Sequence, residues 1–458
     1  MPVEGRALRN SDLEKGNNAA LEAEKPLRTK LTRIAEIAKQ RPRVKLQTLM
    51  HAIDEESLKA AHQALGADKA LGIDGMSKEE YGKQLEENIS DLLGRMKRQA
   101  YKPQPVKRVY IPKGNGKMRP LGIPSYEDKV VQKALNEILT VIYETEFLAC
   151  SYGFRPGRSC HDALKEVGRI LETKKVSYVV DADIKGFFNN IDHGWLMRCL
   201  QERIQDPNLL RLINRILKAG VMEEGVEYDT ETGTPQGGVV SATLANVYLH
   251  YVLDLWFILN IKRESRGEAY IVRYADDFVC FFQYKDDAEA FYGKLIGRLG
   301  KFNLEIAQEK TKILEFGRFA EERRTRRGDG KPETFDFLGF SHYCSKGKPG
   351  NYSVKRKTSR KKFTAKLKVF AEWLHKNMHT EIRDLVKQAN AKLIGHFRYY
   401  GITDNLQRIK AFRYVVRRNL FKILNRRSQK KSLNWDGFAK IEERFPLAKA
   451  RIYVNIYG

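Results

Sequence analysis

The pattern of apolar and polar residues is most informative between Ile271 and Phe282, where two apolar runs flank a pair of acidic residues. Both runs are rich in residues that favour β-strands, and the polar dipeptide between them is typical of a turn. The pattern therefore predicts a β-hairpin with Asp276 and Asp277 at its tip. Because adjacent carboxylates repel each other, a bound hard cation is the usual reason for placing two of them together. A solvated turn is the alternative for this dipeptide taken alone.

A second alternating segment also ends in acidic residues. From residue 176 to residue 183 the alternation predicts a strand with Asp181 and Asp183 on one face. Residues on the same face lie roughly 6.6 Å apart, so only one of the two is expected to share a metal with the hairpin. Asp183, at the strand end, is the better candidate, and Asp181 is predicted to be a structural hydrogen-bond acceptor. Three carboxylates on two strands can hold two Mg²⁺ ions roughly 3.5–4 Å apart, an arrangement suited to nucleotidyl transfer.

Helical periodicity and changes of composition divide the chain into five parts. Residues 1–45 are polar with little apolar periodicity and are predicted to form a mobile arm. Amphipathic helices are predicted over residues 44–66 and 79–98, so residues 46–100 form a helical extension. The other parts are a mixed α+β region, a basic helical region and a short closing segment: residues 101–345, 346–431 and 432–458. A polar stretch in the mixed region, residues 317–334, is expected to be a solvent loop.

The charge of the chain indicates a polyanionic partner. The formal net charge is +26, and residues 341–431 contain 25 Lys and Arg against four acidic residues. Aromatic residues are interleaved with these cations, and some of them recur at helical spacing and are expected in the core. A basic helical region of this kind suits the grip on the phosphates of a nucleic-acid duplex. A solvated basic face without a partner is the alternative.

Other features limit the class of protein. The five cysteines form no Cys-x-x-Cys pair and are expected to be reduced thiols. The most apolar stretch, residues 241–260, is interrupted by polar residues and is predicted to be a buried helix, with no membrane partner. The first 18 residues are polar and carry both charge signs, unlike a signal peptide. A cytoplasmic protein is the expectation.

Seven short motifs occur in one consistent order and carry a family resemblance. They surround the predicted strand and hairpin and extend to both sides of them: residues 108–113 with 119–124, 151–159, 183–188, 233–238, 274–277, 310–311 and 337–340. In this order the chain resembles the group II intron reverse transcriptase/maturase family. The resemblance implies an α+β right-hand polymerase fold, with fingers and palm over residues 101–345 and a helical thumb over residues 346–431.

The resemblance also assigns roles around the catalytic carboxylates. It implies two Mg²⁺ ions, with Mn²⁺ as a substitute, and a metal site at four positions: Asp183, Ile184, Asp276 and Asp277. Lys113 and Arg119, on either side of a Gly-Asn-Gly turn, are expected to clamp a nucleoside triphosphate. Phe188 is expected to wall off the sugar 2′ position, although Phe187 could face the site instead.

Further residues are assigned less directly. Gln236 is expected to reach the nascent base pair, and Lys310 to protonate the leaving pyrophosphate unless it is a surface ion pair. Arg155 and Arg158 are expected to contact the template or to fix the palm. Six thumb cations are expected to bind RNA: Lys355, Arg356, Lys357, Arg360, Lys361 and Lys362.

The resemblance leaves several functions open. The leading one is an RNA-directed DNA polymerase that uses dNTPs and a template–primer duplex, binds its intron RNA as a maturase, and inserts the intron into target DNA by retrohoming. The alternatives are a domesticated or defence-associated polymerase without an intron, and an RNA-binding maturase with little polymerase activity. The short segment over residues 432–458 points to the branch without a His-Asn-His endonuclease, and is either a vestigial DNA-binding piece or a cap on the thumb. The oligomeric state stays open.

Overall fold

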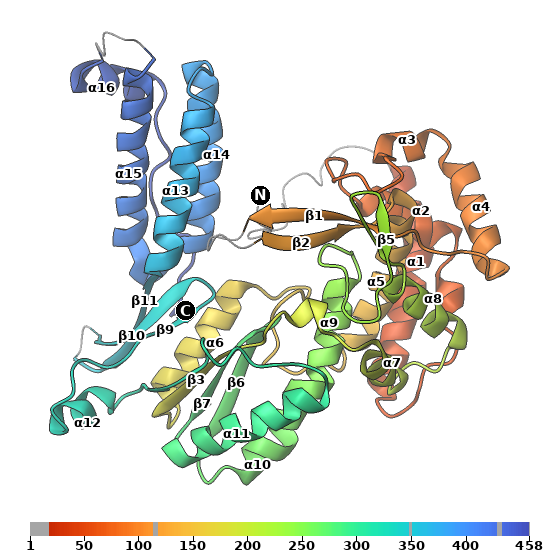
Figure 1. The fold of residues 1–458 in the computed structure, drawn as a ribbon, viewed down its shortest axis with the longest axis horizontal. Coiled ribbons are helices and arrows are strands. Elements are labelled where there is room, and N and C mark those ends of the chain that lie inside the picture. Colours follow the sequence, from red (N-terminus) through yellow and green to blue (C-terminus); the bar gives the residue numbers. More distant parts are fainter. Residues whose placement is uncertain (1–17, 113–117, 348–349, 428–432, 458) are drawn as a thin grey trace.

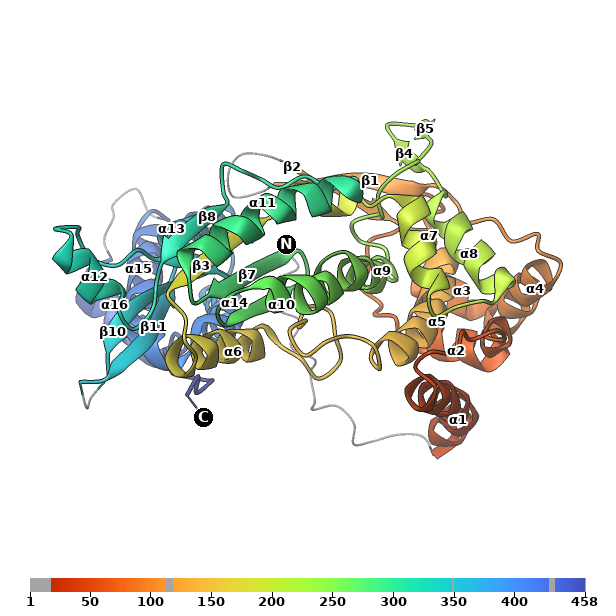
Figure 2. The ribbon, with the colours of Figure 1, turned by 90° about the horizontal axis from the view of Figure 1, so that it is seen from below.

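The computed structural model describes residues 18–112, 118–347, 350–427 and 433–457, with side chains from residue 29 onward. Three groups of elements follow one another along the long axis of the molecule (Figures 1 and 2). N-terminal helices and a four-stranded sheet lie at one end, and a second four-stranded sheet with its helices lies in the middle. A group of long helices stands at the other end (Figure 1). This is the predicted α+β arrangement of fingers, palm and thumb.

The first helix corrects a prediction. Part of the expected mobile arm, residues 18–40, is helix α1 (Asn18–Gln40), which contacts α5 (Tyr126–Tyr143) and buries Ile34 and Ala38. The Arg203 guanidinium donates hydrogen bonds to the Ala38 carbonyl at 2.9 Å and to carbonyls of the chain that follows the helix. These bonds satisfy carbonyls that a helix end otherwise leaves without partners. Leu27, Leu31, Ile34 and Ala38 recur at helical spacing along it, so apolar periodicity was a signal from which this helix could have been predicted.

The helical extension is built from shorter helices than predicted. It contains α2 (Glu55–Ala64), α3 (Lys78–Lys83) and α4 (Leu85–Lys97). The first begins only at Glu55 because the Asp54 side chain accepts a hydrogen bond from the Ser57 amide, a capping box that starts the helix there. The second predicted helix, residues 79–98, is interrupted at Gln84, whose φ of −124° is not helical.

The fingers contain a mixed sheet with the strand order β2-β1-β4-β5. Strand β1 (Val106–Pro112) pairs antiparallel with β2 (Met118–Ile123) and parallel with β4 (Val221–Glu223), which turns into β5 (Val226–Tyr228). In Figure 1 the β1–β2 hairpin reaches from the N-terminal helices toward the thumb. Two further helices belong to this end of the molecule: α7 (His193–Gln201) and α8 (Pro207–Leu217).

The palm is an antiparallel sheet with the strand order β6-β7-β3-β8. Its strands come from three separate parts of the chain: β3 (Tyr178–Asp183), β6 (Ala269–Tyr274), β7 (Asp277–Phe282) and β8 (Lys312–Glu315). Four helices belong to this region: α6 (Cys160–Thr173), α9 (Ser241–Leu249), α10 (Lys262–Glu264) and α11 (Lys285–Lys301). The strand and hairpin predicted around the acidic residues are confirmed.

Two hydrophobic cores meet at the palm sheet. Alternate residues of β7 point to opposite faces, so Phe278 and Cys280 belong to one core and Val279 and Phe281 to the other. The first core continues into α9, α11 and the N-terminal helices, and the second continues through α6 into the thumb. All four side chains are fully buried. The sheet therefore joins the fingers to the thumb through side chains on its two faces.

A three-stranded sheet connects the palm to the thumb. Its order is β11-β10-β9, and its strands are β9 (Phe335–Phe337), β10 (Phe340–Lys346) and β11 (Tyr352–Thr358). The predicted boundary at residue 346 cuts the β10–β11 hairpin, so the thumb helices begin later, at Arg360. The expected solvent loop over residues 317–334 contains a short helix, α12 (Ala320–Arg326).

The thumb consists of three long helices and a shorter one. They are α13 (Arg360–Lys376), α14 (Ile382–Tyr400), α15 (Leu406–Asn425) and α16 (Trp435–Arg444). The Trp435 ring stacks on Phe421 of α15 with centroids 4.0 Å apart, and Glu442 accepts a hydrogen bond from Arg417 at 2.7 Å. The chain then returns to pair Val454 with Ile402. The segment after residue 432 therefore packs on the thumb, as one of its two predicted roles requires.

One helical stretch in the described part of the chain, Ser241–Glu264, is long and apolar enough to cross a membrane by length and composition alone. Inside the fold, 67% of its most apolar window is buried. This burial agrees with the prediction of a helix in the protein core.

Candidate active site on the palm sheet

The predicted carboxylates meet at one end of the palm sheet. Asp183, the last residue of β3, is the cross-strand partner of Asp277, the first residue of β7. Asp276 lies in the turn between β6 and β7, where Ala275 adopts a φ of +57°. A left-handed conformation at a residue other than glycine is uncommon, and it lets a two-residue turn reverse the chain. Three acidic side chains from two strands and one turn are thus brought together.

The fold holds two of these carboxylates, Asp276 and Asp277, in surroundings that disfavour their charge. Burial raises the pKa of Asp277 to about 8, with further contributions from Asp181, Asp276 and Asp183, while a backbone hydrogen bond from Leu338 opposes the rise. Burial also raises the pKa of Asp276, and the positive charges of Arg119 and Arg273 oppose that rise. A cation bound at such a cluster would offset the repulsion between its carboxylates.

Asp181 lies two residues before Asp183, on the same face of β3. Burial raises its pKa to about 7, and the charges of Asp336 and Asp183 add to the effect. Within the described residues, no donor forms a hydrogen bond with its carboxylate, so its predicted role as a hydrogen-bond acceptor has no partner here. Its charge adds to the negative potential of the site.

A lysine supplies positive charge at this end of the sheet. The Lys310 ammonium forms an ion pair with Asp183, and this hydrogen bond raises the pKa of Lys310. The Lys310 side chain is 61% exposed. Among the described residues, no three His, Cys, Asp or Glu side chains are already arranged as a metal shell. The donor set nevertheless suits a hard divalent ion, because three carboxylates lie together at a position where, in the described part of the chain, Lys310 is the ion-pair partner of Asp183.

The Ile184 position follows directly on the strand. Its side chain is buried, and its backbone forms an isolated bridge with Ile306. The flanking residues are fixed by backbone bonds of 2.8 Å, from Ala307 to the Asp183 carbonyl and from Lys185 to the Glu305 carbonyl. A metal contact at Ile184 would therefore involve its main chain, and it stays a prediction.

The fingers bring a second group of predicted residues to the site. Arg119 lies on β2 opposite Ile111, and its charge acts on Asp276. Lys113, its predicted partner in binding triphosphate, lies outside the described residues. The Gln236 carbonyl accepts a hydrogen bond from the Gly122 amide of β2 at 2.9 Å. The loop that carries Gln236 is thereby joined to the fingers sheet.

The two phenylalanines after β3 have different surroundings. Phe187 is buried in the first core, whereas Phe188 is half-buried and packs at the edge of that core. The Phe188 carbonyl accepts a hydrogen bond from Thr234 at 2.8 Å, which places it beside the loop that carries Gln236. Of the two rings, Phe188 is the one with surface left for a ligand, and its role as the group that selects the sugar stays a prediction.

Comparison with known proteins agrees with this geometry. Residues 111–342, about half of the chain, match the family described as "Reverse transcriptase (RNA-dependent DNA polymerase)". The chain belongs to the reverse transcriptase family. The matched region contains all of the palm strands and the carboxylates described above.

Relatives of this reverse transcriptase place it in the group II intron branch, as the motifs indicated. It is 43% identical over 210 residues to the group II intron-encoded protein LtrA of Lactococcus lactis subsp. cremoris, covering 46% of this chain and 34% of LtrA. It is 34% identical over 307 residues to protein YkfC of Escherichia coli K12, covering 59% of this chain and 80% of YkfC. Nuclear intron maturase 4 of Arabidopsis thaliana is 27% identical over 151 residues, or 32% of this chain and 18% of that protein. The chain thus matches about a third of LtrA.

A buried ion pair beneath the hairpin was missed by the sequence analysis. The Arg273 guanidinium is fully buried and binds both carboxylate oxygens of Asp254, at 2.7 and 2.5 Å. It also donates to the Asn246 side chain at 2.9 Å, to the Ala275 carbonyl at 2.9 Å and to the Ser151 hydroxyl at 2.8 Å. A carboxylate inside the apolar stretch of residues 241–260 was the available signal, because buried charges require partners.

The loop between α5 and α6 packs directly against this hairpin. The Tyr152 amide donates to the Arg273 carbonyl at 2.8 Å, and the Gly153 carbonyl accepts from Asn246 at 2.7 Å. A Cβ atom at Gly153 would lie 2.4 Å from the Ala275 nitrogen, so only glycine fits at this contact. The loop therefore supports the turn that carries Asp276.

Two arginines of this loop were expected to contact the template or to fix the palm, and for Arg155 the structure supports the second of these roles. The Arg155 side chain is 3% exposed and donates to Glu144, to the Leu148 carbonyl and to the Ser151 carbonyl. Its hydrogen-bonding groups are directed inward, so it fixes the loop and does not reach a template. Arg158 is half-buried and donates to the carbonyls of Ala149 and Ser151, at 2.8 and 3.1 Å. Arg158 therefore also fixes the loop, while part of its side chain remains exposed to solvent.

The predicted thumb cations also divide into two groups. Arg356 is fully buried in β11, where a Cβ atom at Gly168 of α6 would lie 1.9 Å from its guanidinium, so its assignment to RNA binding is wrong. Its neighbours Lys355 and Lys357 point to the opposite face of the strand. Arg360 and Lys361 are exposed at the start of α13, and Lys362 is half-buried. The alternation of β11 thus separates one structural arginine from cations that remain available.

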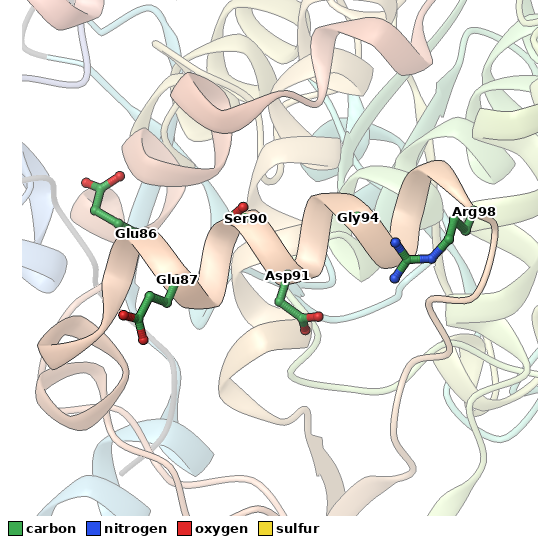
Figure 3. Close-up of a pocket in the computed structure, with 6 residues that line it drawn as sticks. All are labelled: Glu86, Glu87, Ser90, Asp91, Gly94 and Arg98. Atoms are coloured by element: carbon green, nitrogen blue, oxygen red, sulfur yellow. The ribbon is translucent and has the colours of Figure 1, made fainter.

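A surface hollow of about 570 Å³ lies along α4, away from the palm (Figure 3). Glu86, Glu87 and Asp91 line it, together with Arg98. Lys59 pairs with Glu86, and Arg95 pairs with Asp91 at 2.7 Å. Glu86 and Asp91 are thus paired with cations of the same extension, and the hollow contains none of the predicted catalytic residues.

Proposed function

We propose that this chain is an RNA-directed DNA polymerase encoded by a group II intron. The observation that carries the proposal is the pairing of Asp183 with Asp277 across β3 and β7, with Asp276 in the adjoining turn. The matched family is described as an RNA-dependent DNA polymerase, and LtrA is described as group II intron-encoded. Reverse transcription requires a nucleotidyl transfer, for which carboxylates at this spacing are suited.

Each group at the site has a chemical role in the proposed reaction. Asp183, Asp276 and Asp277 would hold two Mg²⁺ ions, or Mn²⁺ in their place, whose charge favours ionisation of the primer 3′-hydroxyl and departure of pyrophosphate. Arg119 is placed to bind the triphosphate through its planar guanidinium. Lys310, whose pKa is raised by its bond with Asp183, holds a proton at Nζ that the leaving pyrophosphate can accept. Phe188 and Gln236 border the position of the incoming nucleotide.

We further propose a maturase role, in which the thumb binds intron RNA. One relative is named as an intron maturase, and, apart from the buried Arg356, the described cations on β11 and α13 are exposed or half-buried. A folded intron presents shape and phosphate more than open bases, so a basic surface suits it. Retrohoming into target DNA would follow from the polymerase activity. A polymerase that functions without an intron is distinguished by the absence of catalytic intron RNA sequences beside the gene.

The first prediction concerns the metal-binding carboxylates. Replacing Asp276→Asn should reduce DNA synthesis on poly-rA with oligo-dT by about a thousandfold or more, because the site loses a charged ligand. The folded protein should be at least as stable at pH 7, because the raised pKa of Asp276 means that its charged form is disfavoured in the fold. Asp286→Asn, at an exposed position on α11, is the control and should keep full activity. Substantial synthesis by the Asp276 variant would remove this turn from the active site.

The second prediction concerns selection of the sugar. Replacing Phe188→Ala should raise the efficiency of ribonucleotide use relative to the matching deoxynucleotide, because the half-buried ring no longer blocks a 2′-hydroxyl. Phe187→Ala is the control: it should lower the free energy of unfolding by about 3–5 kcal/mol without changing this ratio, since Phe187 lies in the core. The measurement is the ratio of kcat/KM for one dNTP and its rNTP. An unchanged ratio in the Phe188 variant would place the selecting group elsewhere.

The third prediction concerns binding of intron RNA by the thumb. Replacing Lys355, Lys357, Arg360 and Lys361 with Gln should flatten the slope of log K against log salt by roughly 3 units, because fewer counterions are released. Single-nucleotide addition at saturating template should survive better than processive synthesis. Arg356→Gln should lower stability without changing the slope, because its guanidinium is buried.

A charge-matched control tests whether the position of the cations matters. Four exposed cations on other parts of the surface can be replaced together with Gln: Arg266, Lys285, Lys294 and Arg326. This variant should keep the salt slope of the unmodified protein. Equal slopes for the thumb and control variants would contradict the proposed RNA surface.

A further inference from the structure

Phe154 combines backbone strain with exposure next to the candidate active site. Its φ is +58°, a left-handed conformation that bulky residues rarely adopt, and its side chain is 53% exposed. A single exposed apolar side chain is ordinary on a protein surface. An exposed apolar side chain on a strained backbone is not ordinary. Strained residues are found where function requires a fixed geometry.

The chain on both sides of Phe154 is fixed, so the residue cannot relax. On one side, Gly153 packs against the backbone of Ala275 and its carbonyl is bonded to Asn246 at 2.7 Å. On the other side, Arg155 is anchored to Glu144 at 2.9 Å and to the Leu148 carbonyl at 2.8 Å. Two anchors on neighbouring residues hold the Phe154 ring outward at a defined place.

That place adjoins the turn of the palm hairpin. The residue before Phe154 touches Ala275, and the residue after Ala275 is Asp276. The Asn246 side chain of α9 donates to the Gly153 carbonyl at 2.7 Å, so this loop lies against α9. A primer end that reacts at the carboxylates must lie against the surface that borders this turn. The end of a nucleic-acid duplex is therefore a group that the exposed ring could contact.

We propose that the Phe154 ring packs against the terminal base pair of the primer–template duplex and positions the primer end. The proposal rests on the proposed polymerase function and adds a positioning residue to it. An aromatic ring suits this role because stacking and edge contacts with bases are independent of sequence. The strained backbone suits it as well, because a ring already held in place loses little freedom on binding.

The test compares three replacements of Phe154 by two kinds of binding measurement. Phe154→Ala and Phe154→Gly should weaken binding of a labelled duplex with a recessed primer by about tenfold, measured by fluorescence anisotropy in the absence of nucleotide. Phe154→Tyr, which keeps the ring, should bind this duplex as the unmodified protein does. Binding of the single-stranded template alone should stay unchanged in all three variants. In primer extension, the KM for primer should rise in the Ala and Gly variants while kcat changes little.

The melting temperature distinguishes a positioning role from a structural one. Replacing a residue that only supports the fold would lower the melting temperature. Phe154→Gly should melt at the same temperature or higher, because glycine adopts this φ without strain. Phe319→Ala, which removes a ring that is 51% exposed at the start of α12, is the control and should bind the recessed duplex normally. Unchanged duplex binding in the Ala and Gly variants would overturn the inference, as would an equal loss of single-strand binding. The proposed function is judged separately, by whether the unmodified protein synthesises DNA.

Discussion

The arrangement of the palm depends on one buried guanidinium. Arg273 joins strand β6 to Asp254 and Asn246 of the helical stretch beneath it, to Ser151 of the loop before α6, and to the Ala275 carbonyl of the hairpin turn. All of these groups are out of contact with water, so their hydrogen bonds cannot be replaced by solvent if the arginine is lost. The turn that carries Asp276 is therefore fixed from below by an ion pair and from the side by Gly153.

This support explains how the fold maintains a cluster of carboxylates that repel one another. Burial and mutual repulsion raise the pKa values of Asp276 and Asp277, which means that the folded state holds these groups against their electrostatic preference. The opposing interactions are the Arg273 network, the register of β3 with β7 and the ion pair between Lys310 and Asp183. The carboxylates that the proposed function requires therefore reduce the stability of the fold, as is common where like charges lie together at an active site.

Local patterns predicted the parts of the site that lie within one strand or one turn. The alternation around Asp183 and the polar dipeptide after Ala275 were sufficient for the strand and the hairpin. Helix α1 was not predicted because the polar composition of residues 1–45 outweighed the helical spacing of Leu27, Leu31, Ile34 and Ala38, and because its packing depends on Arg203, far away in the sequence. Arg356 was assigned to RNA, and Arg155 to the template or the palm, because composition counts a charge without showing its partners, whereas the fold buries both. The Arg273–Asp254 pair joins residues on different elements, so it became visible only in the structure.

The most direct test of this account is the free energy of unfolding of Arg273→Lys, measured by urea denaturation beside DNA synthesis. Lysine keeps the charge but cannot reproduce the forked contacts to Asp254 or the bonds to the turn. The account predicts a loss of about 3–5 kcal/mol, together with a loss of synthesis that persists under conditions where the variant is still folded. Arg158→Lys, in the adjoining loop but half-buried, should lose less than about 1 kcal/mol. Unchanged stability and synthesis in the Arg273 variant would contradict the claim that this ion pair holds the catalytic turn.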